Sequence, residues 1–509
     1  MMVSLVINGQ RISAAPGTTI LEAAREAGIE IPHLCYHPAF PPVGTCRLCA
    51  VEIEGLPKLE PACSTNVKEG MVVRTESPRV VEARRNVLEL LLAEHAMDCP
   101  ICDKAGECRL QDTYQAYSLA PGVYAEDKTR RGKKIALGGG LLLDRERCVL
   151  CTRCVRFLES VTKTSELGVF ERGDRSEIGC VEGRLVDNNY SGCLAEICPV
   201  GAITDSDFRF KTRAWFLEAR ETICPLCGRG CAVFLESHPG FPRVPGTAKA
   251  YRVRSRRDER VNGHWICNVG RYGYGYLEKS RCRELAGPLA KTLNLKAATD
   301  VVAPLAAELR ALKYKGRQTR VAVVLSDWLT NEELFLAGAV FRRDLEIGRC
   351  HLVGPRDGSP DGMLLTAERS PNRAGAKALG FNTEETTLEA LARDTDLLIV
   401  FGPFLQDRFR PADIASAWAG VKTKVLFTPR DEGLGAAFDL VVPTVWPAEK
   451  DGSFTNCQGL IRSFSPALAP PPSAVPEWRL LTALGRAVGL NPSFYIPFRS
   501  AGDVRRAMP

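Results

Sequence analysis

The chain has 509 residues, 45% of them hydrophobic and 25% charged, and a formal net charge of +7; this composition is typical of a soluble globular protein, and the length allows several domains. The basic runs "KTRRGKK" and "YRVRSRR" are short and typical of solvated faces, so we expect no nucleic-acid partner. No apolar run approaches about 18 residues and the N-terminus lacks the pattern of a signal peptide, so we expect no direct membrane insertion and a cytoplasmic location.

The first residues have the pattern of a small sheet and one helix. The alternating run "VSLVING" ends in an expected Asn8-Gly9 turn, after which a second short strand is expected. Thr19 and Glu22 have the spacing of a capping box for the helix "TILEAAREAG", which ends at a glycine. This order predicts a ubiquitin-like β-grasp domain over residues 1–78, which also includes an irregular Pro- and Gly-rich loop and the strand "AVEIEG".

The next stretch predicts a charged amphipathic helix over residues 79–95 and a linker over about 117–140. After about residue 283 the apolar runs "RVAVVLS", "DLLIVFG", "KVLFTP" and "FDLVVPT" alternate with helical runs such as "NEELFLAGAVFRR". Continuous apolar strands separated by helices predict a parallel α/β domain over 283–509. This tail has no G-x-G-x-x-G and no P-loop, and a Pro-rich linker, "SPALAPPPSAVPEW", precedes what we expect to be the last helix.

The chain contains 20 cysteines, most of them in C-x2-C groups before residue 268. Disulfide frameworks are typical of small secreted domains, whereas this chain is large and has no export signal. The clustering therefore favours metal or iron–sulfur ligation.

The first group, which we call the N-terminal set, has the spacing C-x10-C-x2-C-x13-C. Its members are Cys35, Cys46, Cys49 and Cys63. Four thiolates on a β-grasp scaffold are typical of a [2Fe–2S] cluster, and Gly44 lets the loop backbone approach the inorganic sulfides. A zinc ion is the alternative, since four thiolates also bind zinc.

The central set begins with a C-x2-C-x2-C run in a module over residues 138–212. Its members are Cys148, Cys151, Cys154 and Cys198. Cys198 precedes a proline, as does the fourth ligand in ferredoxin-type runs, so we expect one [4Fe–4S] cluster. Cys193 lies one residue out of the register of a second ligand run, and we interpret it as spare.

The late set has the spacing C-x2-C-x3-C-x35-C in a module over residues 217–273. Its members are Cys224, Cys227, Cys231 and Cys267. A zinc ribbon would pair C-x2-C with a second C-x2-C, which does not follow here. The pattern predicts another [4Fe–4S] cluster.

The histidine set, in a module over residues 79–120, has only three clustered cysteines. With the histidine upstream, its members are His95, Cys99, Cys102 and Cys108, at spacing H-x3-C-x2-C-x5-C. The spacing favours His95 as the fourth ligand, with an ordinary structural role as the alternative. A neutral imidazole in place of a thiolate would make the cluster less negative and so act on its reduction potential.

These four sets, in this order, resemble the large iron–sulfur subunit of NADH:quinone oxidoreductase, respiratory complex I. The matching text includes "GTCRLCAVEIEG", "HAMDCPICDKAGECRLQD", "DRERCVLCTRCVRF", "ICPVGAIT" and "HWICNVGRYGY", and it covers residues 1 to about 275. The tail resembles a shortened molybdopterin-oxidoreductase domain at "VVPTVWPAEKDGSFTNCQGLIR". In this family the fourth ligand of the second cluster is a histidine, which implies that role for His95.

The resemblance also implies cofactors, partners and activity. We expect one [2Fe–2S] cluster, three [4Fe–4S] clusters and no molybdopterin, in a multidomain α+β and α/β protein. The expected role is to relay single electrons from a flavin-containing NADH-oxidising subunit towards the quinone site, with no substrate chemistry in this chain. Other peripheral-arm subunits of complex I are the expected partners, on the cytoplasmic side of the inner membrane.

Two other classes of protein resemble the N-terminal part of this chain. Iron-only hydrogenases continue into a cysteine-rich catalytic domain, whereas only three isolated cysteines follow residue 268 here. Formate dehydrogenases have a larger pterin-binding region and, typically, a lysine two residues after the last cluster cysteine, where this chain has Val269. A zinc scaffold without redox activity is the third alternative.

Overall fold

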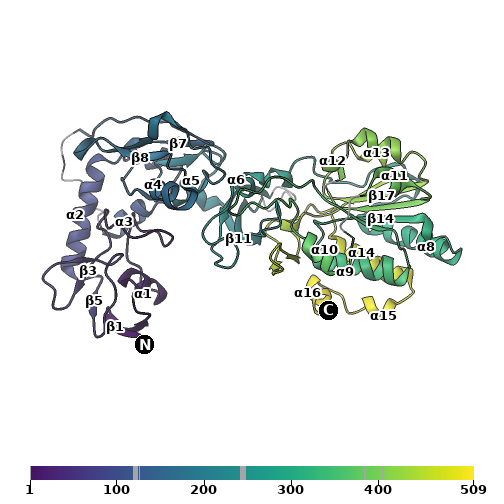
Figure 1. Cartoon of the computed structure of the whole chain (residues 1–509), viewed down its shortest axis with the longest axis horizontal. Helices are drawn as coiled ribbons and strands as arrows, with labels where there is room; N and C mark the ends of the chain where they lie inside the picture. Colours follow the sequence, from purple (N-terminus) through teal and green to yellow (C-terminus); the bar gives the residue numbers. More distant parts are fainter. Residues whose placement is uncertain are drawn as a thin grey trace. The chain divides into compact units, whose positions relative to one another are not determined.

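The computed structural model describes residues 2–117, 124, 127–240, 248–382, 386–403 and 405–508. The chain divides into two compact units, Met1–Phe216 and Leu217–Pro509 (Figure 1). The expected module 217–273 and the α/β tail thus belong to the same unit.

The first unit begins with a mixed sheet in the strand order β2-β1-β5-β3-β4. Its strands are β1 (Val3–Ile7), β2 (Gln10–Ala14), β3 (Ala50–Ile53), β4 (Glu60–Pro61) and β5 (Val72–Arg74). Helix α1 (Ile20–Glu26) begins with the expected capping box between Thr19 and Glu22. It buries Ile20 and Leu21 in the same core as the strand residues Leu5 and Ile7. The predicted hairpin and helix are confirmed.

Helix α2 (Pro78–Glu94) confirms the amphipathic helix, and its C-cap residue is His95. A short η1 turn (Cys99–Ile101) and helix α3 (Arg109–Tyr117) follow. The linker prediction for 117–140 falls partly outside the described residues, since 118–123 and 125–126 are not described. It is wrong at its end, because β6 (Ile135–Gly138) pairs with β7 (Leu141–Leu143) across a turn of glycines with positive φ. Glycine adopts this backbone without strain, so the run makes a turn rather than a linker.

The rest of the first unit surrounds the central cysteines. Strand β10 (Ile203–Asp205) pairs with β7, and β8 (Leu167–Phe170) pairs with β9 (Glu177–Cys180). Helix α4 (Arg153–Phe157) continues as a π-helical turn (Leu158–Thr162) and lies against α5 (Cys193–Ile197).

The second unit begins with an antiparallel sheet of β11 (Glu218–Ile223), β12 (Ala232–His238) and β13 (Lys249–Ser255). After α6 (Asn268–Tyr272) and η7 (Gly273–Leu277), the chain forms a parallel sheet in the order β15-β14-β16-β17-β18. Its strands are β14 (Val321–Ser326), β15 (Cys350–Val353), β16 (Leu397–Phe401), β17 (Thr423–Thr428) and β18 (Leu440–Pro443). The parallel α/β prediction is confirmed, although β15 was not predicted, since its first two residues are only partly buried.

Helices cover both faces of this sheet (Figure 1). One face packs against α8 (Val302–Tyr314), α9 (Asn331–Ala337) and α14 (Glu477–Val488), and the other against α11 (Leu388–Ala392) and α13 (Pro411–Ala417). Shorter elements are α7 (Pro288–Thr292), α10 (Arg373–Ala378), α12 (Leu405–Arg408) and the hairpin of β19 (Gly452–Thr455) and β20 (Ile461–Phe464). The helix after the Pro-rich segment is not the last, because α15 (Pro492–Tyr495) and α16 (Ala501–Ala507) follow it.

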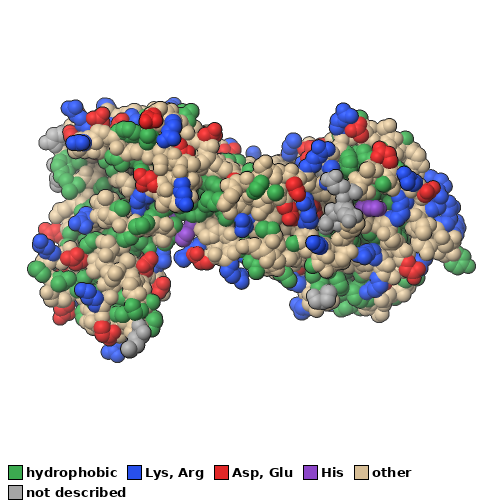
Figure 2. Space-filling model, in the orientation of Figure 1, with side chains coloured by type: hydrophobic (Ala, Val, Ile, Leu, Met, Phe, Trp, Pro, Cys, Tyr) green, Lys and Arg blue, Asp and Glu red, His purple; other side chains and the backbone are tan. Residues whose placement is uncertain are grey.

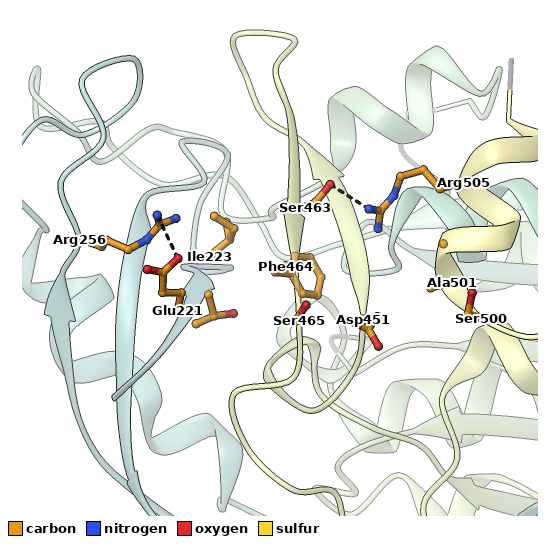
Figure 3. Close-up of a pocket in the computed structure, with 12 residues that line it drawn as sticks. Glu221, Ile223, Arg256, Asp451, Ser463, Phe464, Ser465, Ser500, Ala501 and Arg505 are labelled. Carbon is orange, nitrogen blue, oxygen red and sulfur yellow. Dashed lines mark hydrogen bonds and ion pairs between the residues drawn. The ribbon is translucent and has the colours of Figure 1, made fainter. Parts of the chain in front are cut away.

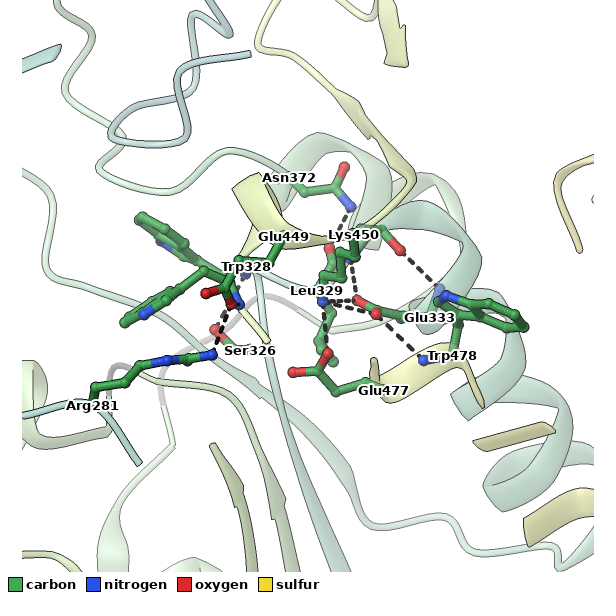
Figure 4. A network of polar contacts seen from close by, with 12 residues as sticks. Arg281, Ser326, Trp328, Leu329, Glu333, Asn372, Glu449, Lys450, Glu477 and Trp478 are labelled. Atoms are coloured by element: carbon green, nitrogen blue, oxygen red, sulfur yellow. Dashed lines mark hydrogen bonds and ion pairs between the residues drawn. The ribbon is translucent and has the colours of Figure 1, made fainter. Parts of the chain in front are cut away.

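A buried polar network joins these elements (Figure 4). The Lys450 ammonium lies 2.8 and 2.9 Å from the two carboxylate oxygens of Glu333 on α9 and 2.7 Å from Glu477 on α14. Nearby, Arg281 pairs with Glu449 at 2.8 Å. The segment before β19 is therefore anchored to two helices by charges that are almost completely buried.

None of the described helices combines the length and the apolar character needed to cross a membrane. Figure 2 shows Lys and Arg side chains interspersed with Asp and Glu over the visible face.

Candidate metal centres

The N-terminal set occupies two loops, with Cys35, Cys46 and Cys49 between α1 and β3 and Cys63 between β4 and β5. All four cysteines are buried. The amides of Leu34 and Cys35 donate to Cys46 Sγ at 3.4 and 3.5 Å. A hydrogen bond from the Cys46 thiol lowers the pKa of Cys35 and raises that of Cys46, and the same relation holds between Cys63 and Cys49. The structure therefore brings together the four thiols that the spacing predicts.

Glycine at position 44 has a positive φ of +63°. Its amide donates to Cys63, which helps to lower the pKa of that thiol. Backbone N–H groups that point at sulfur are what a cluster site requires of its loop, and a left-handed residue turns the amide inward without the steric cost that a side chain would add.

In the histidine set, the end of α2 places His95 beside the loop of the three cysteines. The Cys99 thiol lies close enough to help raise the pKa of Cys102, and the Cys102 thiol does the same for Cys108, with burial as the main cause of both shifts. The charged groups nearest the imidazole are Asp98, Lys128 and Arg147.

The His95 imidazole is only 9% exposed, and its Nδ1 has no hydrogen-bond partner. Burial lowers the pKa of His95 to about 4, so the ring is neutral at physiological pH. A neutral imidazole with an unpartnered buried nitrogen is chemically suited to metal ligation.

The backbone of Gly201 lies very close to the Cys102 thiol. A Cβ built on Gly201 would lie 2.2 Å from Cys102 Sγ, so only glycine fits there without displacing the thiol. The Arg213 guanidinium donates to the carbonyl oxygen of Cys102 at 2.7 Å. The loop is thus held from both sides.

The central set surrounds one small cavity of about 20 Å³, which all four of its cysteines line together with apolar side chains such as Leu143 and Ile178. Leu150 and Thr152 have left-handed backbones, with φ of 49° and 57°, and the Leu150 amide donates to Cys148 Sγ at 3.4 Å. Burial raises the pKa of Cys148 to about 12 and that of Cys151 to about 11.

Cys193, which we interpreted as spare, is not among the residues that line this cavity. It is the first residue of α5 and is buried.

The late set lies between the antiparallel sheet and α6. Cys224 follows β11, its amide donates to the carbonyl of Cys231 at 2.9 Å, and Cys267 is the N-cap of α6, accepting from the Gly270 amide at 3.4 Å. The four thiols interact, and burial raises the pKa of Cys224 and Cys231 well above the usual value.

The α/β tail contacts the loop of the late set directly. The Gly228 amide donates to the carbonyl of Glu368 at 3.0 Å, and the Cys457 amide donates to the carbonyl of Gly228 at 2.7 Å. Asn456 also donates to the carbonyl of Arg229 at 3.1 Å. The tail therefore holds the loop that carries Cys227 and Cys231.

Within the described part of the chain, no three His, Cys, Asp or Glu side chains converge closely enough to hold a single metal ion. The unpartnered His95 nitrogen, the cavity of the central set and the electrostatic influence of the thiols on one another within each set fit a bound iron–sulfur group. The residues that we had not identified from the sequence are arginines that donate to backbone carbonyls of ligand cysteines. They are Arg156 and Arg213. The run "CTRCVRF", with Arg156 two residues after a cysteine, is the sequence signal that could have pointed to the first of them.

A separate pocket of about 630 Å³ lies between β11, β20 and the start of α16 (Figure 3). Three of its charged residues already have partners: Glu221 pairs with Arg256 at 3.3 Å, and Arg505 pairs with Glu332 at 2.6 Å and donates to Ser463 at 3.0 Å. None of the cysteine sets contributes to its lining.

Comparison with known families defines the class of protein. Residues 1–78 match a 2Fe-2S iron-sulfur cluster binding domain, and residues 84–120 match the NADH-ubiquinone oxidoreductase-G iron-sulfur binding region. Residues 138–204 match the ferredoxin-like domain of NADH-quinone oxidoreductase subunit 3. The first unit is therefore that of an iron–sulfur protein with both 2Fe-2S and 4Fe-4S regions.

Similarity to individual proteins narrows the class of iron–sulfur protein further. The chain is 40% identical over 278 residues to a G subunit of the NADH-quinone oxidoreductase of Rhizobium meliloti, covering 54% of this chain and 32% of the relative. It is 35% identical over 337 residues to the corresponding G subunit of Streptomyces coelicolor, covering 66% and 39%. The resemblance to the large iron–sulfur subunit of NADH-quinone oxidoreductase, indicated by the motifs, is confirmed.

Two further matches extend the comparison. The NADPH-Fe(3+) oxidoreductase subunit alpha of Geobacter sulfurreducens is 32% identical over 400 residues, covering 78% of this chain and 44% of that protein. A crystal structure of an NAD+-reducing [NiFe]-hydrogenase matches with 35% identity and a TM-score of 0.38, over 41% of this chain and 90% of that one. The chain spans less than half the length of the curated relatives named here.

Proposed function

We propose that this chain is an electron-relay subunit of an NADH:quinone oxidoreductase, which passes single electrons from a flavin-containing NADH-oxidising subunit towards the quinone site. One observation carries the proposal: three successive family regions cover the N-terminal, histidine and central sets in this order, and the late set follows with four buried cysteines. Bound iron–sulfur clusters would supply one-electron redox chemistry at these sets. The chain's own residues hold the clusters, exclude water and point amides at sulfur.

The finer assignment is that the N-terminal set holds one [2Fe–2S] cluster in a β-grasp ferredoxin domain over 1–78. The histidine, central and late sets each hold one [4Fe–4S] cluster, in modules over 79–120, 138–212 and 217–273. The tail over 283–509 is a shortened molybdopterin-oxidoreductase-like domain without pterin. Other peripheral-arm subunits of complex I are the proposed partners, with the complex on the cytoplasmic face of the inner membrane.

The contacts within the first unit support a continuous relay, with the central set in the middle. On one side, Arg156 donates to the carbonyls of Cys35 and Cys151, one in the N-terminal and one in the central set. On the other side, the Arg109 amide donates to the carbonyl of Pro199 at 3.1 Å, beside Cys198 and Cys108. Since electron transfer weakens steeply with distance, sites joined through one or two hydrogen bonds suit single-electron hopping.

Metal analysis and spectroscopy test the assignment. Anaerobically purified protein should contain about 14 irons per chain, from one [2Fe–2S] and three [4Fe–4S] clusters. Electron paramagnetic resonance of the reduced protein should resolve one [2Fe–2S] signal beside the [4Fe–4S] signals. Stoichiometric zinc with little iron would instead identify a zinc scaffold.

The long match to the Geobacter protein favours a second candidate, an electron relay that is supplied by NADPH. The partner subunits decide between the two. A co-purified complex whose clusters are reduced by NADH and reoxidised by quinone supports the first proposal, whereas reduction by NADPH alone supports the second.

A further inference from the structure

Helix α4 includes Cys154 of the central set and carries two arginines that connect two ligand sets. The Arg156 Nη2 group donates to the carbonyl oxygen of Cys151 at 3.2 Å and also to the carbonyl oxygen of Cys35. One guanidinium is thus bonded to the main chain of ligand cysteines from two different sets. Its Nη1 group adds a bond to Pro41 at 3.1 Å, and its charge lies over the Phe40 ring.

Arg153 repeats this arrangement one turn earlier. Its Nη1 group donates at 3.0 Å to the carbonyl of Ile197, the residue before Cys198, and its Nη2 group donates to the carbonyl of Tyr36, the residue after Cys35. The side chain is only 4% exposed. Both arginines therefore bridge the same two sets, the N-terminal set and the central set.

The second observation concerns the charged groups that surround these two guanidiniums. The cysteines close to Arg153 are Cys151, Cys198 and Cys35, which carry negative charge only when they are deprotonated as ligands, and the guanidinium of Arg109 is a further charged neighbour. In the described part of the chain, neither Arg153 nor Arg156 pairs with a carboxylate. Arg153 is buried and Arg156 is half-buried. A buried cation such as Arg153 without a paired carboxylate is costly unless other negative charge compensates it, and the thiolate ligands of both clusters can supply that charge.

We propose that Arg156 and Arg153 are positioning residues shared by the N-terminal and central clusters, which fix the separation of the two sites and raise the reduction potential of both. The inference rests on the proposed function, because it requires clusters in both sets. A positive charge between two sites stabilises the added electron on either of them. The hydrogen bonds through the Arg156 guanidinium also connect the two ligand loops directly.

The test is a redox titration of the full-length, cluster-loaded protein followed by electron paramagnetic resonance, which distinguishes [2Fe–2S] from [4Fe–4S] signals. Arg156→Met should lower the reduction equilibrium constants of the [2Fe–2S] and central clusters together, by about tenfold each, which is about 59 mV for one electron. The cluster of the histidine set should keep its potential. A shift confined to one cluster, or no shift in either, would overturn the proposal.

Arg213→Met is the matched control, because Arg213 donates to the carbonyl of Cys102 in the histidine set and to Pro100 in the same loop. It should shift the potential of that cluster alone. Arg156→Lys keeps the charge but has no planar fork to reach two carbonyls. It should retain both potentials and weaken the magnetic coupling between the two reduced clusters, and unchanged coupling would contradict the positioning role.

If Arg156→Met does not retain both clusters, the reduction potentials and the magnetic coupling measured for Arg156→Lys test the proposal instead. Absence of clusters from the wild-type protein would instead refute the proposed function itself.

Discussion

At the scale of single residues, His95 shows how position and burial prepare a side chain to bind metal. The end of α2 sets its backbone, burial keeps the imidazole neutral by lowering its pKa to about 4, and Nδ1 has no partner in the protein. A neutral ligand makes a cluster less negative than a fourth thiolate would. The ligand role itself stays a prediction.

Replacement of His95 by alanine tests that role. We expect His95→Ala to lose or alter one [4Fe–4S] signal while the [2Fe–2S] spectrum stays intact, because the ligands of each set interact mainly with one another. Electron paramagnetic resonance and iron analysis measure the outcome. Cys193→Ser is the control and should leave the central cluster in place, whereas survival of every signal in His95→Ala would make the histidine structural.

Gly201 provides a second test at this scale. A Cβ at this position would lie 2.2 Å from Cys102 Sγ, so Gly201→Ala should displace that thiol. We expect loss or distortion of the cluster of the histidine set, even though Gly201 is close in sequence to Cys198 of the central set. Gly168→Ala is the control, since its nearest contact would be an ordinary 3.4 Å. Equal spectra for the two variants would show that the loop tolerates the methyl group.

At the scale of elements, the second unit depends on charges buried between helices. Lys450 is paired with two carboxylates, Glu333 from α9 and Glu477 from α14, and all three side chains are almost completely buried. Burial raises the pKa of Glu333, and the ammonium opposes that shift. The network therefore joins α9, α14 and the segment before β19 only while the positive charge is present.

Removal of that charge should destabilise the second unit. We expect Lys450→Met to lower the free energy of unfolding by about 3–5 kcal/mol at neutral pH, because it leaves buried carboxylates uncompensated. Urea unfolding followed by tryptophan fluorescence measures the change. Lys279→Met, which breaks the exposed pair with Glu432, is the control and should cost less than about 1 kcal/mol.

The same variant should show a defined pH dependence. Without Lys450 the folded-state pKa of Glu333 rises further above its unfolded value, so the folded protein retains a proton that the unfolded chain releases. In the wild type this pKa is already raised to about 7, so the stability of Lys450→Met should fall relative to wild type as pH rises above about 7. An unchanged difference across this range would show that the carboxylates find other compensation.

At the scale of the whole molecule, the two units divide the ligand sets between them. The first unit carries the N-terminal, histidine and central sets, and the second carries the late set together with the α/β domain. Hydrogen bonds from the tail to Gly228 and Arg229 hold the late-set loop. The tail thus has a structural role at the late set whether or not it binds anything else.

We expect this tail to bind no molybdenum or tungsten. Val269 stands where formate dehydrogenases typically have a lysine, and the tail of about 225 residues is little more than one large domain. Elemental analysis of the purified chain and of its assembled complex measures both metals. Near-stoichiometric molybdenum or tungsten, or reduction of the clusters by formate, would place the protein with the formate dehydrogenases.

The sequence by itself determined the features that depend on short spacing. Thiols a few residues apart in one loop must lie near one another, so the clustered cysteines of each set could be expected to lie together, and "CTRCVRF" placed two of the central cysteines around one turn. Continuous apolar runs likewise determined the buried parallel strands β14, β16, β17 and β18, because only strands covered on both faces are apolar throughout.

Only the tertiary structure decided the contacts between residues far apart in the chain. Arg156 reaches the carbonyl of Cys35 across 121 residues, Gly201 lies against Cys102, and the short, partly exposed strand β15 forms because β14 is there to pair with it. A local pattern carries no information about such neighbours, since they depend on how whole elements pack. The cysteines therefore show which chemistry the chain can support, and the packing decides which charges and carbonyls surround it.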